Sequence, residues 1–201
     1  PRPSPELAGS RKMEVDYLLP RLVRTAAILK ERTGSRFRFL LAAAPSIDRS
    51  YYDRYLHGNP DIEVIYGDTY GVLSHSAAAA ISSRTHSPPP APPASLEAAV
   101  IGTPQVVCYG MNPITYAIAR MVVRLDTISL ANMILGRHIF RELLQGDCTP
   151  EHIAGELLRM TDDTAYRSRM LSDYDDMRAL LGEKDSARRT AADIERLIKE
   201  K

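Results

Sequence analysis

The sequence has few cysteines, no long apolar run and no excess of charge of either sign, and each shortage excludes a class of protein. Two cysteines in 201 residues are too few for a disulfide framework, which favours a reducing compartment such as the cytoplasm. No run approaches the roughly 20 apolar residues that a membrane-spanning helix needs. The 26 basic residues are balanced by 25 acidic ones, so nucleic acid is not an expected partner.

The general catalytic and metal-binding motifs are also missing. The sequence contains no H-x-x-x-H or C-x-x-C pair, so we expect no metal site, and Cys108 is expected to be a buried small apolar residue. It contains no nucleophile elbow, no phosphate-binding loop of the Walker type and no G-x-G-x-x-G. The function must therefore be inferred from the order of the predicted strands and helices, and from residue patterns that fewer proteins share.

Short apolar runs alternate with amphipathic stretches, as in a parallel sheet covered by helices. We therefore predict an α/β fold, a Rossmann-like doubly wound parallel sheet with a helical tail, in which ligands bind beyond the carboxyl ends of the strands. The predicted strands are residues 37–44, 62–67, 77–82, the last being buried and central, 104–110, and 127–135, which continues into a loop. The predicted helices are residues 14–33, 46–55, a short one through 70–73, 95–102, 114–124, 149–160 and two more in 164–201.

Two helix starts carry residues suited to a nucleotide. The first helix is preceded by Gly9, Ser10 and Arg11. Their backbone N–H groups and the guanidinium of Arg11 form either a cradle for a phosphate or an ordinary helix-capping loop. Ser95 opens the helix after the strand 77–82, and Glu97 either accepts both hydroxyls of a ribose or complements the helix dipole.

A third stretch, SLANMILGRHIFRELLQ, places Asn132 in a loop after a strand, where it binds a ligand or makes a turn. His138 in the same stretch is expected to be a surface residue rather than a base. The acidic residues Asp173, Asp175 and Asp176 are expected to form a solvated helix face.

Three segments in this order, LAGSRKMEV, SLEAAVIGTPQVVCYGMNP and ISLANMILGRHIFRELLQ, resemble the C-terminal half of the lipid-A-disaccharide synthase family. The resemblance runs from about residue 7 to about residue 174. It implies a GT-B glycosyltransferase whose active site lies between two Rossmann-like domains. The chain would supply residues 1–160 as the UDP-sugar domain and residues 161–201 as a helical tail, and the N-terminal acceptor domain would be absent.

The family reaction is an inverting, metal-independent hexosyl transfer without a cofactor. It converts UDP-2,3-diacylglucosamine and 2,3-diacylglucosamine 1-phosphate (lipid X) into lipid A disaccharide 1-phosphate and UDP. The resemblance implies a cytoplasmic enzyme, peripheral to the inner membrane of a Gram-negative bacterium, and allows a homodimer formed through the tail. Four arginines have two possible roles. They form a positively charged edge near the anionic lipid headgroups, or they lie on solvated helix faces. They are Arg120, Arg124, Arg137 and Arg141.

The resemblance also implies roles for individual residues. Arg11 and Asn132 would be catalytic, Arg11 by meeting the diphosphate and offsetting charge on the departing UDP. Donor binding would involve Gly9, Ser10, Arg11, Ser95, Glu97 and Asn132. The general base of the family lies in the N-terminal domain.

The segment RTHSPPPAPP interrupts the resemblance just before Ser95. Relatives carry a glycine turn there, whereas prolines supply no N–H to a diphosphate. We interpret residues 83–93 as an atypical insertion or a local reading-frame error, which the nucleotide sequence would test. The alternatives are a non-catalytic UDP-binding fragment, another GT-B UDP-sugar enzyme such as a UDP-N-acetylglucosamine 2-epimerase, and a purely structural α/β domain.

Overall fold

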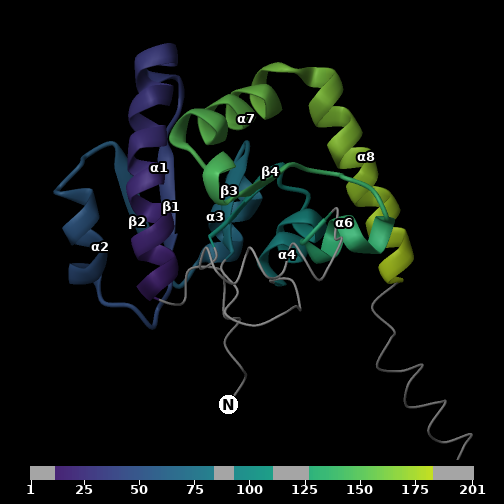
Figure 1. Ribbon diagram of the computed structural model, residues 1–201, viewed down its shortest axis with the longest axis horizontal. Coiled ribbons are helices and arrows are strands. Elements are labelled where there is room, and N and C mark those ends of the chain that lie inside the picture. The colour runs from purple at the N-terminus through teal and green to yellow at the C-terminus, as the bar shows by residue number, and fades with distance from the viewer. Residues whose placement is uncertain (1–11, 84–92, 111–126, 183–201) are drawn as a thin grey trace, which may run out of the picture.

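Parallel strands and surrounding helices make up the part of the protein that the structure describes (Figure 1), a computed structural model that covers residues 12–83, 93–110 and 127–182. The strands are β1 (Phe39–Ala43), β2 (Ile62–Tyr66), β3 (Ala79–Ser83), β4 (Gln105–Tyr109) and β5 (Glu142–Leu144). The helices are α1 (Lys12–Thr33), α2 (Arg49–Leu56), α3 (Thr69–His75), α4 (Pro93–Ile101), α6 (Leu130–Leu135), α7 (Pro150–Asp162) and α8 (Thr164–Leu181), with 3₁₀ turns η1 (Gly34–Arg36) and η2 (Gln145–Asp147).

Every strand pair in these ranges is parallel, which confirms the predicted α/β class. β1 pairs with β2, and a second sheet has the order β3-β4-β5. Helices α1 and α7 pack against each other and contact β3, whereas α3 and α4 pack against each other and contact β1 and β4. The result is a Rossmann-like arrangement with helices in two groups around parallel strands.

The core is centred on β4. All five of its residues are at most 1% exposed, because β3 and β5 flank it and helices cover it. Helix α8 adds Met170, Tyr174 and Met177 to the same apolar cluster. The rings of Phe140 and Tyr174 meet edge to face, with centroids 6.4 Å apart and an interplanar angle of 68°.

Local capping signals are confirmed. The hydroxyl of Thr149 accepts a hydrogen bond from the backbone N–H of His152 at 3.2 Å, which starts α7 as predicted. Gly34 ends α1 with φ +64°, a conformation that glycine adopts without strain. Pro20, expected in the first turns, lies well inside α1 on its exposed side.

Three other expectations need correction. Residues 130–135 form helix α6 where a strand and loop were predicted. Strand β3 pairs with β4 alone among the described residues, so β4 takes the central place that was predicted for residues 77–82. Helix α4 begins at Pro93, two residues before the predicted start, because proline suits the first position of a helix. The predicted helix 114–124 and the last part of the tail lie outside the described residues.

Candidate functional site

The carboxyl ends of β3, β4 and β5 lie at one edge of the second sheet; Ser95 and Glu97 follow β3 in the chain, and Asn132 follows β4. The start of α1 reaches this edge. The Tyr17 hydroxyl donates toward the carbonyl of Tyr109, the last residue of β4, at 3.5 Å, and toward that of Gln145, just after β5, at 3.2 Å. Gly9, Ser10 and Arg11 lie outside the described residues, directly before this end of α1.

Ser95 and Glu97 have different surroundings although both lie on α4. Ser95 is fully buried, and its carbonyl accepts a hydrogen bond from the Gln105 side-chain amide at 2.7 Å. Glu97 is half-buried in the second turn of the helix. That position weakens the alternative role as a helix-dipole partner, because the dipole acts mainly on the first turn.

Tyr70, which no sequence pattern singles out, lies near the predicted site residue Glu97. Its hydroxyl interacts with the carboxylate of Glu97, and the residue is 46% exposed at the start of α3. Desolvation first, and then the charge of Glu97, raise the pKa of Tyr70. Asp68 fixes the start of this helix by accepting from the Gly71 N–H at 2.9 Å. A carboxylate and an aromatic hydroxyl therefore lie near each other between α3 and α4.

Asn132 lies on α6 and is fully buried. Its amide nitrogen donates to the Phe140 carbonyl at 3.2 Å and to the Glu142 carboxylate at 3.1 Å, and its amide oxygen accepts from the Ile139 N–H at 2.9 Å. Both amide hydrogens are thus bound to the protein. A direct contact between Asn132 and a ligand stays a prediction, and the amide links α6 to the chain that enters β5.

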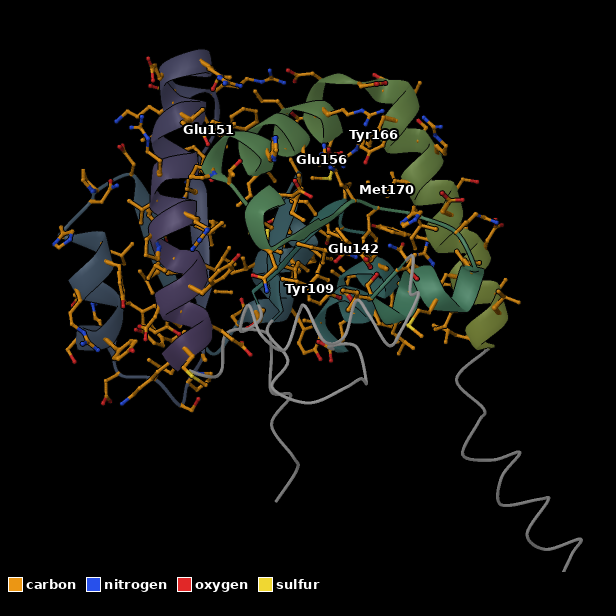
Figure 2. All side chains as sticks on the ribbon, viewed as in Figure 1. Tyr109, Glu142, Glu151, Glu156, Tyr166 and Met170 are labelled. Atoms are coloured by element: carbon orange, nitrogen blue, oxygen red, sulfur yellow. The ribbon has the colours of Figure 1, made fainter. Side chains whose placement is uncertain are left out.

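The carboxylate of Glu142 organises the start of the same helix. It accepts from the backbone N–H groups of Ile128 at 2.9 Å and Ser129 at 2.6 Å, in addition to the Asn132 amide. Both N–H groups belong to the residues that lead into α6, so this distant acceptor fixes the chain just before the helix starts. Glu142, labelled in Figure 2, is the first residue of β5 in the three-stranded sheet.

The two cysteines lie behind this edge. Both are buried free thiols, as expected for Cys108, and they interact with each other. That interaction first, and then desolvation, raise the pKa of Cys108, whereas the same interaction lowers the pKa of Cys148. Desolvation first, and then Cys148, raise the pKa of Tyr17 to about 12, so its hydroxyl stays protonated at neutral pH.

The charged residues singled out in the sequence are mostly paired. The Arg137 guanidinium contacts Asp173 and Asp176 on α8, each at 2.6 Å, so the acidic face is not simply solvated as expected. Arg141 contacts the buried carboxylate of Glu156 at 3.2 Å. Arg120 and Arg124 lie outside the described residues, and His138 is exposed as predicted.

Glu156 is the most deeply buried carboxylate of these pairs. Its side chain is 2% exposed, and the Tyr166 hydroxyl interacts with it where α7 and α8 meet (Figure 2). Desolvation first, and then the interaction with Glu156, raise the pKa of Tyr166. The arrangement joins α7, α8 and the start of β5, which is a structural role. Among residues 12–83, 93–110 and 127–182, no three histidine, cysteine, aspartate or glutamate side chains gather as metal ligands, and no helix could cross a bilayer.

Comparison with known proteins identifies the relatives of this chain. Residues 4–195 match the family model described as lipid-A-disaccharide synthetase. The lipid-A-disaccharide synthase of Anaeromyxobacter dehalogenans (strain 2CP-1) is 34% identical over 188 residues, which cover 92% of this chain and 47% of that protein. The synthase of Myxococcus xanthus is 36% identical over 194 residues, covering 96% and 48%. The chain thus spans about half the length of the curated relatives that it matches.

Proposed function

Because the chain belongs to the lipid-A-disaccharide synthetase family, we propose that it supplies the donor-binding half of a glycosyltransferase of lipid A biosynthesis. Family membership argues against the alternative of a UDP-N-acetylglucosamine 2-epimerase. The proposed division is a UDP-sugar domain over residues 1–160 and a helical tail over residues 161–201. The non-catalytic UDP-binding fragment stays open as the second candidate, because the chain spans only half of its relatives.

The proposed reaction is an inverting hexosyl transfer from UDP-2,3-diacylglucosamine to 2,3-diacylglucosamine 1-phosphate. The acceptor hydroxyl attacks the anomeric carbon, the bond from that carbon to the UDP oxygen breaks, and the hydroxyl proton passes to a general base. The products are UDP and lipid A disaccharide 1-phosphate. The base is expected from the half of the enzyme that this chain does not span.

The observation that carries the proposal is the pair formed by Glu97 and Tyr70. Glu97 is half-buried at the edge where nucleotides bind in doubly wound folds, and the Tyr70 hydroxyl interacts with it. An ionised carboxylate accepts from both hydroxyls of a ribose, and the tyrosine restricts its rotamers. Glu97 would therefore hold the ribose of UDP, and Tyr70 would position Glu97.

Arg11, with Gly9 and Ser10, would bind the diphosphate. Support comes from the position of α1, whose start reaches the carboxyl ends of β4 and β5 through Tyr17. A guanidinium there would stabilise the negative charge that develops on UDP as the glycosidic bond breaks. The side chains of Ser95 and Asn132 are buried. We therefore propose that they contribute to donor binding indirectly, by fixing the backbone beside the nucleotide.

The proposal extends to location and partners. A chain acting on acylated sugars would work at the cytoplasmic surface of the inner membrane. With Arg137 and Arg141 already paired to carboxylates, electrostatic attraction to that surface would rest on other residues. Dimer formation through the tail is likewise proposed from the family alone.

Calorimetric titration with UDP tests the proposal. We expect Glu97→Gln and Arg11→Ala each to weaken UDP binding by at least about tenfold, since each removes a charge-assisted hydrogen bond worth roughly 1.5–3 kcal/mol. Tyr70→Phe should weaken it less, because it removes only the positioning contact. Glu31→Gln, an exposed change near the far end of α1, is the control and should leave binding unchanged. Equal binding by Glu97→Gln and the natural chain would refute the assignment.

A further inference from the structure

The backbone at Gln145 adopts an uncommon conformation. In the part of the chain that the structure describes, two residues other than glycine have a positive φ, His57 at +49° and Gln145 at +47°. A Cβ atom makes this left-handed region unfavourable, so residues other than glycine rarely adopt it. Those that do are concentrated at helix ends and at binding or catalytic sites. Each of the two residues therefore has to be explained by its surroundings.

His57 is explained by the end of a helix. It directly follows α2, and its N–H donates to the Asp53 carbonyl at 2.9 Å. Helices commonly close with one residue in the left-handed conformation. His57 is exposed and precedes β2, so it lies toward the amino end of that strand, whereas the candidate site lies at carboxyl ends.

Gln145 follows a strand, so a helix end does not explain its conformation. β5 ends at Leu144, and η2 begins with Gln145. Its main-chain carbonyl accepts two hydrogen bonds, from the Tyr17 hydroxyl at 3.2 Å and from the Cys148 N–H at 3.1 Å. A glycine at this position would make both bonds and would adopt the positive φ without strain. These two contacts therefore give no reason for a glutamine side chain.

The candidate donor site brings a ligand toward this residue. The second sheet has the order β3-β4-β5, and the carboxyl ends of these strands form one edge. Glu97, proposed for the ribose, lies on the helix that follows β3. The cradle proposed for the diphosphate precedes α1, which reaches the end of β4 through Tyr17. A UDP-sugar bound in this order directs its hexose toward the end of β5, where Gln145 lies.

The Gln145 side chain carries the hydrogen-bonding groups that a sugar requires. Its amide has two N–H donors and one acceptor oxygen. Hydroxyl groups likewise donate and accept, whereas the oxygens of an ionised diphosphate only accept. In a donor acylated at positions 2 and 3, the hydroxyls at positions 4 and 6 of the hexose remain free. Gln145 is half-buried, which leaves part of the residue accessible to a ligand.

We propose that Gln145 is a further donor-site residue, and that its side-chain amide hydrogen-bonds to the free hydroxyls of the hexose. The inference rests on the proposed function, which fixes the direction of the nucleotide along the edge. The left-handed backbone conformation is retained with a glutamine because the side chain binds the donor. Since free UDP lacks the hexose, this contact favours the donor over the product.

Calorimetric titration of the full chain with UDP and with UDP-N-acetylglucosamine, which carries the same two hydroxyls, tests the inference. Gln145→Gly removes the amide but suits the backbone conformation. We expect it to weaken UDP-N-acetylglucosamine binding by about fivefold and UDP binding by less than about twofold, because it removes neutral hydrogen bonds to the hexose alone. The matched control His57→Gly makes the same change of backbone preference after α2 and should leave both affinities unchanged.

Urea denaturation separates binding from folding. Both glycine variants should unfold at or above the urea midpoint of the natural chain, because glycine adopts a positive φ without strain. Gln145→Asn, which tolerates the same conformation but shortens the side chain by one methylene, should show the same selective loss. It replaces the glycine variant if that variant does not fold. An equal loss of affinity for both ligands, or no loss for either, would overturn the inference.

The titrations also separate this inference from the proposed function. If the natural chain binds UDP and Glu97→Gln weakens that binding, but Gln145→Gly binds both ligands as the natural chain does, the inference alone fails. If the natural chain binds neither UDP nor UDP-N-acetylglucosamine, the proposed function fails and the inference fails with it.

Discussion

At the residue scale, the Asn132 amide makes three hydrogen bonds in a site without solvent access. Asn132→Ala would leave the Ile139 N–H and the Phe140 carbonyl without these partners. We expect a loss of about 2–4 kcal/mol in the free energy of unfolding, measured by urea denaturation. Asn59→Ala, which removes one bond to the Asp61 N–H in a partly exposed turn, is the matched control and should cost less than about 1 kcal/mol. Similar losses in both variants would contradict this account.

Gly110 provides a second test at the residue scale. A Cβ at this position would lie 2.5 Å from ring carbons of Tyr17, so Gly110→Ala must displace the ring that contacts Gln145. We expect a cost of about 1–3 kcal/mol from overpacking. In a Tyr17→Ala background the same change should cost little, because the clash is gone. Additive losses in this double-mutant cycle, followed by thermal unfolding, would show that the ring is not the obstacle.

At the element scale, α8 is held against α4 by Arg178. Its guanidinium donates to the carbonyls of Ala99 and Val100, both at 3.1 Å, at the end of α4 where carbonyls lack partners in the helix. Arg178→Ala should lower the free energy of unfolding by about 1 kcal/mol, a modest value because the side chain is partly exposed. Arg169→Ala, on the same helix and stacked only distantly on Tyr166, is the control. A larger loss from the control would contradict the assignment.

The elements that the sequence predicted correctly are those with local signals. Helix α7 has its Thr149 cap and α1 has its closing Gly34, and both signals lie within a few residues of the helix end. Helix α6 was missed because no local side chain caps it, and the residues that lead into it are fixed by Glu142, more than ten residues away in the chain. The central place in the second sheet was misassigned because an alanine run shows burial on both faces but not how many strands flank it.

The candidate site, like the helices, was predictable only where the signal lies close in the sequence. Glu97 could be selected from its place after a strand and near a helix start. Its partner Tyr70 could not, because the two residues are separated by 27 positions and no periodicity links them. The burial of Asn132 was not predictable either, since an asparagine at the end of a predicted strand is interpreted as a loop residue until its three partners are known.

At the scale of the whole molecule, one edge of the fold brings together the start of α1, the pair of Glu97 and Tyr70, and the helix that Asn132 and Glu142 support (Figure 1). These parts come from segments far apart in the sequence. Parallel strands bring their carboxyl ends to a common edge, which explains why a nucleotide site can be built there from short, separate patterns.

The most direct test of the central claim is hydrogen exchange of the full chain with and without saturating UDP. We expect UDP to slow exchange in residues 93–101, 127–132 and at the start of α1, and to leave α2 and β2, residues 49–66, unchanged. Protection confined to these three segments would place the nucleotide at the carboxyl edge. Protection elsewhere, or none in a folded chain, would contradict the proposed donor site.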